Sequence, residues 1–296
     1  VRSAGASQSG DAMIEGQPSD TARQTAAARA AHLAFDPPPH LLEDRAAEAL
    51  LGEDARALME PYRDGGPWIL AENRLFITLR ARYAEDRLRA AHAQGVRQYV
   101  LLGAGLDSFA FRRPAALSDV TIYEVDHPST QDWKRARLEE LGWPIPENVH
   151  FVPCDFERRR ASEVLRAAGF DPEGRAVVCW MGVVYYLRKE TVATSLADLA
   201  SLLADGSEVV LDYMRPWEEL SARYLEIRDQ MTAWLERAGE PQVTRYPREE
   251  LLETIRKAGF AHAHTEDRDE IVRRYLRPLE IRIPLSERFG LAVATR

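Results

Sequence analysis

The chain has 296 residues, of which 45% are hydrophobic and 29% charged, enough for one large domain or two small ones with a filled core. Its 39 Lys and Arg residues against 47 Asp and Glu residues give a formal net charge of −8. This balance argues against nucleic acid or an anionic membrane as a partner, because binding phosphate groups requires a basic face.

The two cysteines and the start of the chain indicate the compartment. Cys154 and Cys179 lie in apolar stretches, so we expect buried free thiols in a reducing environment and no bound metal. Residues 1–19 are small and polar and lack the apolar run of a secretion signal, and no stretch of about 18 apolar residues exists to span a membrane. The sequence therefore predicts a cytoplasmic protein with a flexible tail at residues 1–19.

Residues 20–95 are predicted to form a helical cap ahead of the first strand. Asp20 or Thr21 can cap an alanine-rich helix, which must end at the prolines of "DPPPH", because proline blocks continuation of a helix. Two further helices are expected at residues 41–52 and 71–95, with glycines as their C-terminal stops.

The next part of the chain alternates between short apolar runs and helical segments. This alternation predicts a doubly wound parallel sheet with helices on both faces. The expected strands are residues 98–103, 120–126, 149–155, 176–182 and 207–214, and the expected helices between them are residues 129–141, 160–169 and 189–206.

The C-terminal third completes the predicted domain. Residues 215–248 look like an amphipathic helical insertion after the fifth strand, placed to cover the strand ends as a lid or substrate wall. A helix at 247–258 and strands at 261–267 and 289–295 follow. We therefore expect one domain over residues 20–296, whose core at 96–214 binds the ligand and whose residues 249–296 finish the sheet.

The predicted binding site begins at the glycine turn after the first strand. Ligands of open parallel sheets bind beyond the carboxyl ends of the strands. There Gly103 and Gly105 can bring backbone close to a ligand. A dinucleotide fingerprint needs a third glycine, but that position holds Ser108. Judged alone, the turn could also be a purely structural corner, although a ligand-binding turn is favoured.

Side chains at the ends of the next strands narrow the range of ligands that the site could bind. Asp126, with Glu124 as a second candidate, can accept hydrogen bonds from ribose hydroxyls. Asp155 and Phe156 can meet an adenine ring, and an arginine ahead of the first strand, at position 80 or 82, can hold a carboxylate. An adenosine without phosphates that carries an amino acid tail fits this set, which suggests S-adenosylmethionine.

Four motifs carry a resemblance to a known family. "LLGAGLDSFAFR", "YEVDHP", "CDF" and "WMGVVYYL", in this order and spacing, resemble the leucine carboxyl methyltransferase family, which includes bacterial small-molecule O-methyltransferases. The resemblance runs from about Asp20 to the C-terminus. It implies an α/β, Rossmann-like class I methyltransferase with seven strands, the last of them antiparallel, and a helical cap.

The resemblance also implies roles for individual positions. The glycine turn would line the methionine part of the cofactor, Arg80 would hold its carboxylate, and Asp126 would hold the ribose. Many family members carry Glu in the loop after the fourth strand, where this chain has Met181, so that contact must come from backbone carbonyls or another side chain. The implied cofactor-binding residues are Arg80, Gly103, Ala104, Gly105, Asp126, His127, Asp155, Phe156 and Met181.

Three tyrosines are the candidates for orienting the substrate. Tyr186 matches the family tyrosine beside the substrate, and Tyr185 and Tyr213 lie near it along the predicted strand ends. A carboxylate acceptor is ionised near pH 7 and needs no base, whereas a phenol or alcohol does. None of the seven histidines is a clear base, which mildly favours a carboxylate. We therefore expect an S-adenosylmethionine-dependent O-methyltransferase that acts on a small molecule of specialised metabolism.

Four alternatives stay open at this point. The acceptor could be a C-terminal carboxylate of a protein, or the fold could bind the cofactor without transferring methyl. A nicotinamide-dependent oxidoreductase is disfavoured by the missing third glycine. A base-modifying methyltransferase is disfavoured because "DPPPH" lacks the aromatic residue of that signature and follows a helix.

Overall fold

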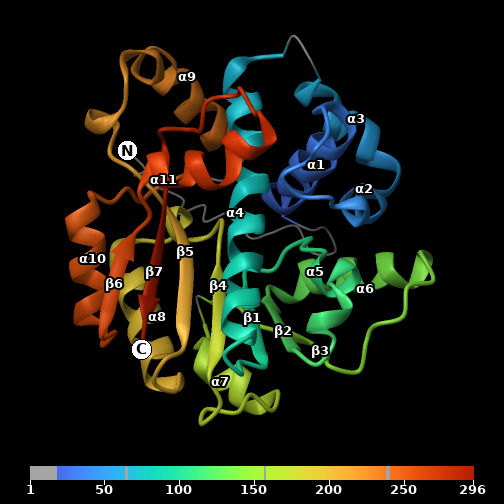
Figure 1. Ribbon diagram of the computed structural model, residues 1–296, viewed down its shortest axis with the longest axis vertical. Coiled ribbons are helices and arrows are strands. Elements are labelled where there is room, and N and C mark those ends of the chain that lie inside the picture. Colours follow the sequence, from blue (N-terminus) through green and yellow to red (C-terminus); the bar gives the residue numbers. More distant parts are fainter. Residues whose placement is uncertain (1–18, 64–65, 157, 238–240) are drawn as a thin grey trace, which may run out of the picture.

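One seven-stranded sheet, in the order β3-β2-β1-β4-β5-β7-β6, runs through the computed structural model (Figure 1). The structure describes residues 19–63, 66–156, 158–237 and 241–296, so nearly all of the expected N-terminal tail lies outside it. The strands β1 to β5 pair in parallel, and β7 pairs antiparallel with β5 and β6, as predicted. The strand bounds are β1 Gln98–Leu102, β2 Thr121–Asp126, β3 Val149–Pro153, β4 Ala176–Trp180, β5 Glu208–Met214, β6 His262–Thr265 and β7 Phe289–Thr295.

The predicted helices appear in the expected order among the described residues, and three further short helices, at Ala55–Met59, Phe109–Arg112 and Arg268–Ile271, were not predicted. None of them is both long enough and apolar enough to cross a bilayer. Their bounds are α1 Asp20–Phe35, α2 Arg45–Leu51, α3 Ala55–Met59, α4 Trp68–His92, α5 Phe109–Arg112, α6 Pro128–Glu140, α7 Ala161–Ala167, α8 Lys189–Leu202, α9 Ala222–Arg237, α10 Arg248–Lys257 and α11 Arg268–Ile271.

Two helical predictions need correction. The helix expected at residues 41–52 begins only after Asp44, because that side chain caps the helix by accepting a hydrogen bond from the N–H of Ala47 at 3.0 Å. Of the described residues in the insertion at 215–248, the helical ones are those of α9, a short 3₁₀ turn at Trp217–Glu219, and Arg248 at the start of α10. Its residues 241–247 are not helical and begin and end with a proline, which cannot continue a helix.

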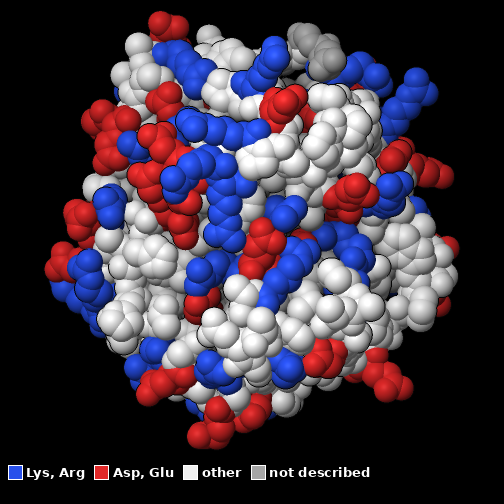
Figure 2. All heavy atoms as spheres, viewed as in Figure 1, with Lys and Arg blue, Asp and Glu red and all other residues white. Residues whose placement is uncertain are grey.

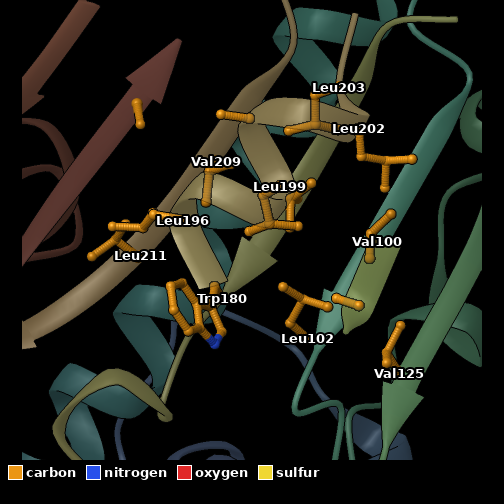
Figure 3. Close-up of a cluster of buried hydrophobic side chains, with 14 of the residues drawn as sticks. Val100, Leu102, Val125, Trp180, Leu196, Leu199, Leu202, Leu203, Val209 and Leu211 are labelled. Carbon is orange, nitrogen blue, oxygen red and sulfur yellow. The ribbon is translucent and has the colours of Figure 1, made fainter. Parts of the chain in front are cut away.

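Two hydrophobic clusters cover opposite faces of the sheet. In β1, Val100 and Leu102 belong to one cluster, whereas Tyr99 and Leu101 belong to the other, as the two-residue period of a strand requires. The first cluster packs the sheet against α7, α8 and α10. Figure 3 shows its leucines from α8 over the sheet. The second cluster packs the sheet against α4, α5 and the helical turns after α11, and the predicted buried free thiols, Cys154 and Cys179, lie one in each cluster.

The alanine-rich sequence of α1 is explained by close packing in the cap. Ala26, Ala27, Ala28, Ala30 and Ala31 are almost completely buried in a third cluster with residues of α2, α3 and the loop after β1. Small side chains let the helices approach closely, and the burial of Leu106 in the same cluster joins this packing to the glycine turn. The face that α4 crosses carries Lys and Arg side chains interleaved with Asp and Glu side chains (Figure 2).

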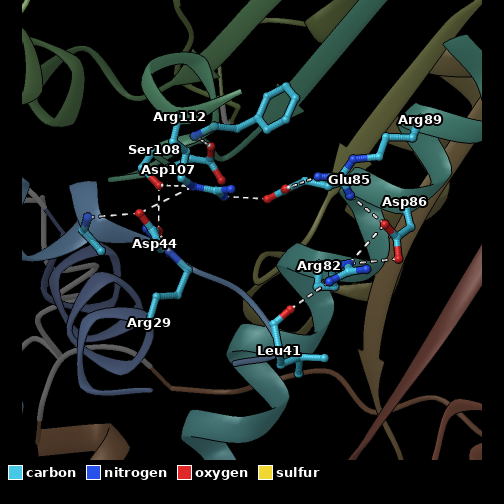
Figure 4. Close-up of polar contacts among 12 residues, drawn as sticks. Arg29, Leu41, Asp44, Arg82, Glu85, Asp86, Arg89, Asp107, Ser108 and Arg112 are labelled. Atoms are coloured by element: carbon cyan, nitrogen blue, oxygen red, sulfur yellow. Dashed lines mark hydrogen bonds and ion pairs between the residues drawn. The ribbon is translucent and has the colours of Figure 1, made fainter. Parts of the chain in front are cut away.

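A buried ionic network ties the cap to the glycine turn (Figure 4). Asp44 accepts hydrogen bonds from Arg29 at 2.7 Å and from Ser108 at 2.6 Å. Arg29 also donates to the carbonyl of Leu106 at 2.6 Å, and Arg112 donates to Ser108 at 2.9 Å and to Glu85 at 2.5 Å. Burial opposes ionisation of Asp44, but the guanidinium groups of Arg29 and Arg112 outweigh it and hold its pKa below the usual range.

Replacing Asp44 by Asn is expected to lower the free energy of unfolding by about 3–5 kcal/mol, because Arg29 then loses its buried counter-charge and Arg112 keeps only Glu85. The folded pKa of Asp44 lies below its unfolded value of 3.8, so its contribution is complete above that pH and disappears as the pH falls. Urea unfolding at pH 7 measures the loss. The matched control, Glu250→Gln, breaks the exposed ion pair with Lys189 and should cost less than about 1 kcal/mol; an equal cost would contradict the prediction.

Candidate active site

A cavity of about 990 Å³ lies at the carboxyl ends of the first four strands, between the sheet and the cap. Its walls come from the loops after β1, β2, β3 and β4, from α1, from one face of α4, and from Pro241 and Val243. All nine residues that the family resemblance assigned to the cofactor line this cavity, namely Arg80, Gly103, Ala104, Gly105, Asp126, His127, Asp155, Phe156 and Met181. The topology thus brings together side chains that lie far apart in the sequence.

The glycine turn is compressed between the loop after β4 and helix α1. Gly103 and Gly105 have φ angles of +70° and +51°, in the left-handed region that favours glycine. A Cβ on Gly103 would overlap with Cγ2 of Val183, and a Cβ on Gly105 would lie 3.0 Å from Cβ of Ala22. The turn therefore presents bare backbone to the cavity, because side chains at these positions would collide with Val183 and Ala22, which also line it.

Asp126 joins the glycine turn to the end of β2. One carboxylate oxygen accepts a hydrogen bond from the N–H of Gly105, and the other accepts one from the N–H of His127 at 2.6 Å. Burial raises the pKa of Asp126, and these two hydrogen bonds act in the opposite direction. Each carboxylate oxygen keeps a further lone pair, so the group can also accept hydrogen bonds from a ligand.

Glu124, the second candidate acid, is buried on β2 beneath the loops that line the cavity. It forms a buried ion pair with Lys134 at 2.5 Å, and Lys134 also donates to the carbonyl oxygen of Asp107 at 2.6 Å. Burial raises the pKa of Glu124 to about 6, although the charge of Lys134 partly offsets this effect. Glu124 does not line the cavity within the described part of the chain, so the structure separates it from Asp126.

Of the two candidate arginines, only Arg80 lines the cavity. Its Nη1 donates to Asp212 at 2.8 Å and to the hydroxyl of Tyr185 at 2.9 Å. Burial alone would lower the pKa of Arg80, but Tyr185 and Asp212 raise it, so the guanidinium is charged. Arg82 lies on another face of α4, where it pairs with Asp86 at 3.0 Å.

Asp212 is the buried site residue that the sequence analysis missed. It is fully buried on β5, where one oxygen binds Arg80 and the other accepts a hydrogen bond from the N–H of Gly182 at 2.7 Å. The carboxylate therefore fixes both α4 and the loop after β4, beside Met181. Its signal in the sequence is an acid inside the apolar run "VVLDYM", because a buried carboxylate requires a partner.

The three tyrosine candidates occupy different positions. Tyr186 lines the cavity, while Tyr185 lies behind it with its hydroxyl on Arg80. Tyr213 belongs to the first hydrophobic cluster, with its hydroxyl hydrogen-bonded to Thr265, and is not among the described residues that line the cavity.

The remaining candidates complete the rim. Asp155 and Phe156 follow β3, where Phe156 packs against the first hydrophobic cluster and Asp155 forms an ion pair with Arg158 at 3.3 Å. His127 uses Nδ1 to accept a hydrogen bond from the N–H of Ser129 at 3.3 Å at the start of α6. Among the described residues, no three His, Cys, Asp or Glu side chains are grouped to hold a metal ion.

The strand order β3-β2-β1-β4-β5-β7-β6 is that of the class I methyltransferase fold. A crystal structure from Thermobifida fusca, described as a "putative methyltransferase", aligns with a TM-score of 0.58 at 19% identity, over 88% of this chain and 98% of the other. A second, from Nostoc punctiforme and described as a "putative O-methyltransferase", aligns with a TM-score of 0.50 at 12% identity, over 77% and 60% of the two chains. At these identities the alignments support the fold alone.

Sequence comparison gives the family. Residues 22–200 match the model of the leucine carboxyl methyltransferase family, so the chain belongs to that family. It is 31% identical over 195 residues to the "Putative S-adenosyl-L-methionine-dependent methyltransferase YktD" of Bacillus subtilis, which covers 65% of this chain and 64% of the relative. A relative from Parafrankia, also named "Putative S-adenosyl-L-methionine-dependent methyltransferase", is 37% identical over 59% of this chain and 57% of the relative. The chain thus spans less than two thirds of either relative's length.

Replacing Gly103 by Ala is expected to cost about 1–3 kcal/mol more stability than replacing Gly142 by Ala, because only the first substitution overfills its surroundings. Gly142 has a similar φ of +63°, but a Cβ there would meet no atom within 4 Å, so it is matched for backbone strain. Thermal or urea unfolding of the two variants provides the comparison. Equal losses would show that the contact with Val183 does not constrain the turn.

Proposed function

We propose that this protein is an S-adenosylmethionine-dependent O-methyltransferase that transfers methyl to a carboxylate or hydroxyl group of a small molecule. The observation that carries the proposal is the cavity in which the bare glycine turn, Asp126, Asp155 with Phe156, and Arg80 all meet. At about 990 Å³ it is at the upper end of the range of about 300–1,000 Å³ for ligand pockets, which favours a cofactor together with a small acceptor.

The polar, charged and aromatic groups that line the cavity match the chemistry of that cofactor. Asp126 can accept hydrogen bonds from ribose hydroxyls, and Phe156 offers an apolar ring for adenine. The planar, charged guanidinium of Arg80 can bind a carboxylate through two hydrogen bonds. Ser108, which replaces the third glycine of a dinucleotide fingerprint, is buried and bonded to Asp44 and Arg112. The start of α5 is therefore occupied by internal contacts, which favours a ligand without a pyrophosphate.

The protein's contribution to the reaction is orientation and exclusion of water. The bound cofactor supplies a methyl group activated by the sulfonium, which an oxygen nucleophile attacks in line. Tyr186 lies at the cavity wall where its hydroxyl can orient an acceptor, and Ile77, Val183 and Val243 provide apolar walls that exclude water. The proposed acceptor is a carboxylate before a hydroxyl, because an ionised carboxylate needs no base.

Arg80→Lys is expected to weaken binding of S-adenosylhomocysteine about tenfold, because an ammonium keeps the charge facing Asp212 but loses the two-pronged contact with the ligand's carboxylate. Isothermal titration calorimetry measures the change. Arg82→Lys is the matched control on the same helix and should leave the affinity unchanged, since that side chain pairs with Asp86 outside the cavity. No binding by folded wild-type protein would refute the proposed function.

With a carboxylic acid as acceptor, kcat/KM is expected to stay constant between about pH 6 and 8, because the acceptor is fully ionised in that range. A phenol acceptor would instead give a rate that increases with pH until a base or the phenol itself is ionised. Radiolabelled methyl transfer to a panel of small acids and phenols distinguishes the two. Methylation of peptides in preference to every small acid would contradict the small-molecule assignment.

Tyr186→Phe is expected to lower kcat/KM about 3- to 10-fold, which corresponds to the loss of one hydrogen bond to the acceptor. Tyr213→Phe removes a hydroxyl from the hydrophobic cluster beside Thr265 and serves as the matched control. The same methyl-transfer assay compares the two variants. Equal effects would remove Tyr186 from the proposed acceptor site.

A further inference from the structure

The acidic side chains that line the cavity differ in what already contacts them. Within the described part of the chain they are Glu85, Asp107, Asp126 and Asp155. Asp126 accepts one backbone hydrogen bond on each oxygen, and Asp155 forms an ion pair with Arg158. Glu85 is buried, and each of its oxygens contacts a different arginine. These three acids therefore already have partners within the protein for their charge or for both of their oxygens.

Asp107, in the loop after β1, is the acid with an open oxygen. Its Oδ1 accepts a hydrogen bond from the N–H of Phe109 at 2.8 Å. Among the residues that the structure describes, no donor contacts its Oδ2, and no Lys, Arg or His nitrogen lies within 4.0 Å of the carboxylate. The residue is partly exposed and lines the cavity, in contrast to the buried Glu85. Asp107 is therefore the cavity acid left to neutralise a cationic group of a ligand.

Contacts within the protein hold Asp107 in place before any ligand binds. Its carbonyl oxygen accepts a hydrogen bond from Lys134 at 2.6 Å, and Lys134 is itself paired with the buried Glu124. Its carboxylate closes a turn onto the N–H of Phe109 at the start of α5. Figure 4 shows Asp107 beside the network around Asp44. A carboxylate fixed in this way loses little conformational freedom when it binds a ligand.

One apolar wall of the cavity lies near both Asp107 and Arg80. This wall is the end of β4, where Cys179 and Met181 line the cavity and pack in the second hydrophobic cluster. Burial raises the pKa of the Cys179 thiol to about 12; the negative charge of Asp107 adds to this effect, and the positive charge of Arg80 opposes it. A carboxylate and a guanidinium therefore lie near the same uncharged wall.

We propose that Asp107 binds the α-ammonium group of the cofactor's amino acid tail, as the counterpart of Arg80 at the carboxylate of that tail. This rests on the proposed function, in which S-adenosylmethionine occupies the cavity. An ammonium group that leaves water needs an acceptor, preferably one of opposite charge. Met181 has no charge to offer, so the negative partner comes from the loop after β1. A zwitterionic tail matches one guanidinium and one carboxylate that share an uncharged wall.

Calorimetry with two ligands tests this inference without turnover. The ligands are S-adenosylhomocysteine and its deaminated analogue, in which hydrogen replaces the amino group. We expect wild-type protein to bind S-adenosylhomocysteine about 10- to 100-fold more tightly, the effect of one charge-assisted hydrogen bond. Asp107→Asn is expected to abolish this preference, because the amide keeps an oxygen for Phe109 but turns its NH₂ group, which cannot accept, toward the ligand. Equal affinities in the wild type, or a preference that survives in Asp107→Asn, would overturn the inference.

The deaminated analogue also separates ligand binding from a structural role of Asp107. The Asn variant should bind this analogue as tightly as the wild type or more tightly, since its carboxylate no longer meets a nearby negative charge. If Asp107 only held the turn, the variant would weaken both ligands to the same extent and the preference would survive. Asp107→Ser covers the case in which the Asn variant does not fold, because a serine hydroxyl can accept the same turn hydrogen bond. It should lose the preference in the same way.

Asp171→Asn is the matched control variant. Asp171 forms the same kind of turn, with Oδ1 accepting a hydrogen bond from the N–H of Glu173 at 3.0 Å. It is exposed and is not among the described residues that line the cavity. Both affinities should therefore equal those of the wild type, and a loss of the preference in this variant would contradict a specific role of Asp107.

The outcomes distinguish this inference from the proposed function. Binding of S-adenosylhomocysteine by the wild type with a preference that survives in Asp107→Asn overturns the role of Asp107 and leaves the proposed function intact. Binding of neither ligand by folded wild-type protein refutes both.

Discussion

The carboxylate of Asp44 is the interaction on which the site most depends. It accepts hydrogen bonds from Arg29 on α1 and from Ser108 beside the glycine turn, and it caps α2 through Ala47. Three parts of the chain therefore converge on one buried carboxylate. The positive charges of Arg29 and Arg112 lower its pKa and so keep it ionised. Because the cavity lies between the cap and the sheet, its shape follows from how firmly this charge holds the two together.

A second buried pair has a comparable role on the other side of the cavity. Asp212 binds Arg80 from α4 and the N–H of Gly182 from the loop after β4. The Arg80 guanidinium is thereby held in a fixed orientation before any ligand arrives, which lowers the cost of ordering it on binding. Many members of the family carry an acid in the loop after the fourth strand, where this chain has Met181. Asp212, on the neighbouring strand β5, places a negative charge against that loop through its hydrogen bond with Gly182.

The cations in and around the cavity differ in how their charges are balanced. At the cofactor end, buried cations have acidic partners, as in the pairs of Arg80 with Asp212 and Lys134 with Glu124. Arg288 and Arg245 lie outside the cavity, and their contacts within the described residues are with amides, carbonyls and aromatic rings. The groups proposed to bind the cofactor are thus held in place by buried ion pairs before any ligand is bound.

The sequence by itself determined the order of the main helices and strands, the glycine turn and the strand-end acids. It could do so because apolar periodicity and the backbone preferences of glycine and proline act over a few neighbouring residues. Residue patterns alone could not choose between Arg80 and Arg82, or between Asp126 and Glu124, and only the family resemblance selected Arg80 and Asp126. Each pair is close in sequence, and it is packing that directs one member into the cavity. Asp212 was found only in the tertiary structure. Its role depends on partners far away along the chain, and no local pattern encodes which charges meet when the sheet assembles.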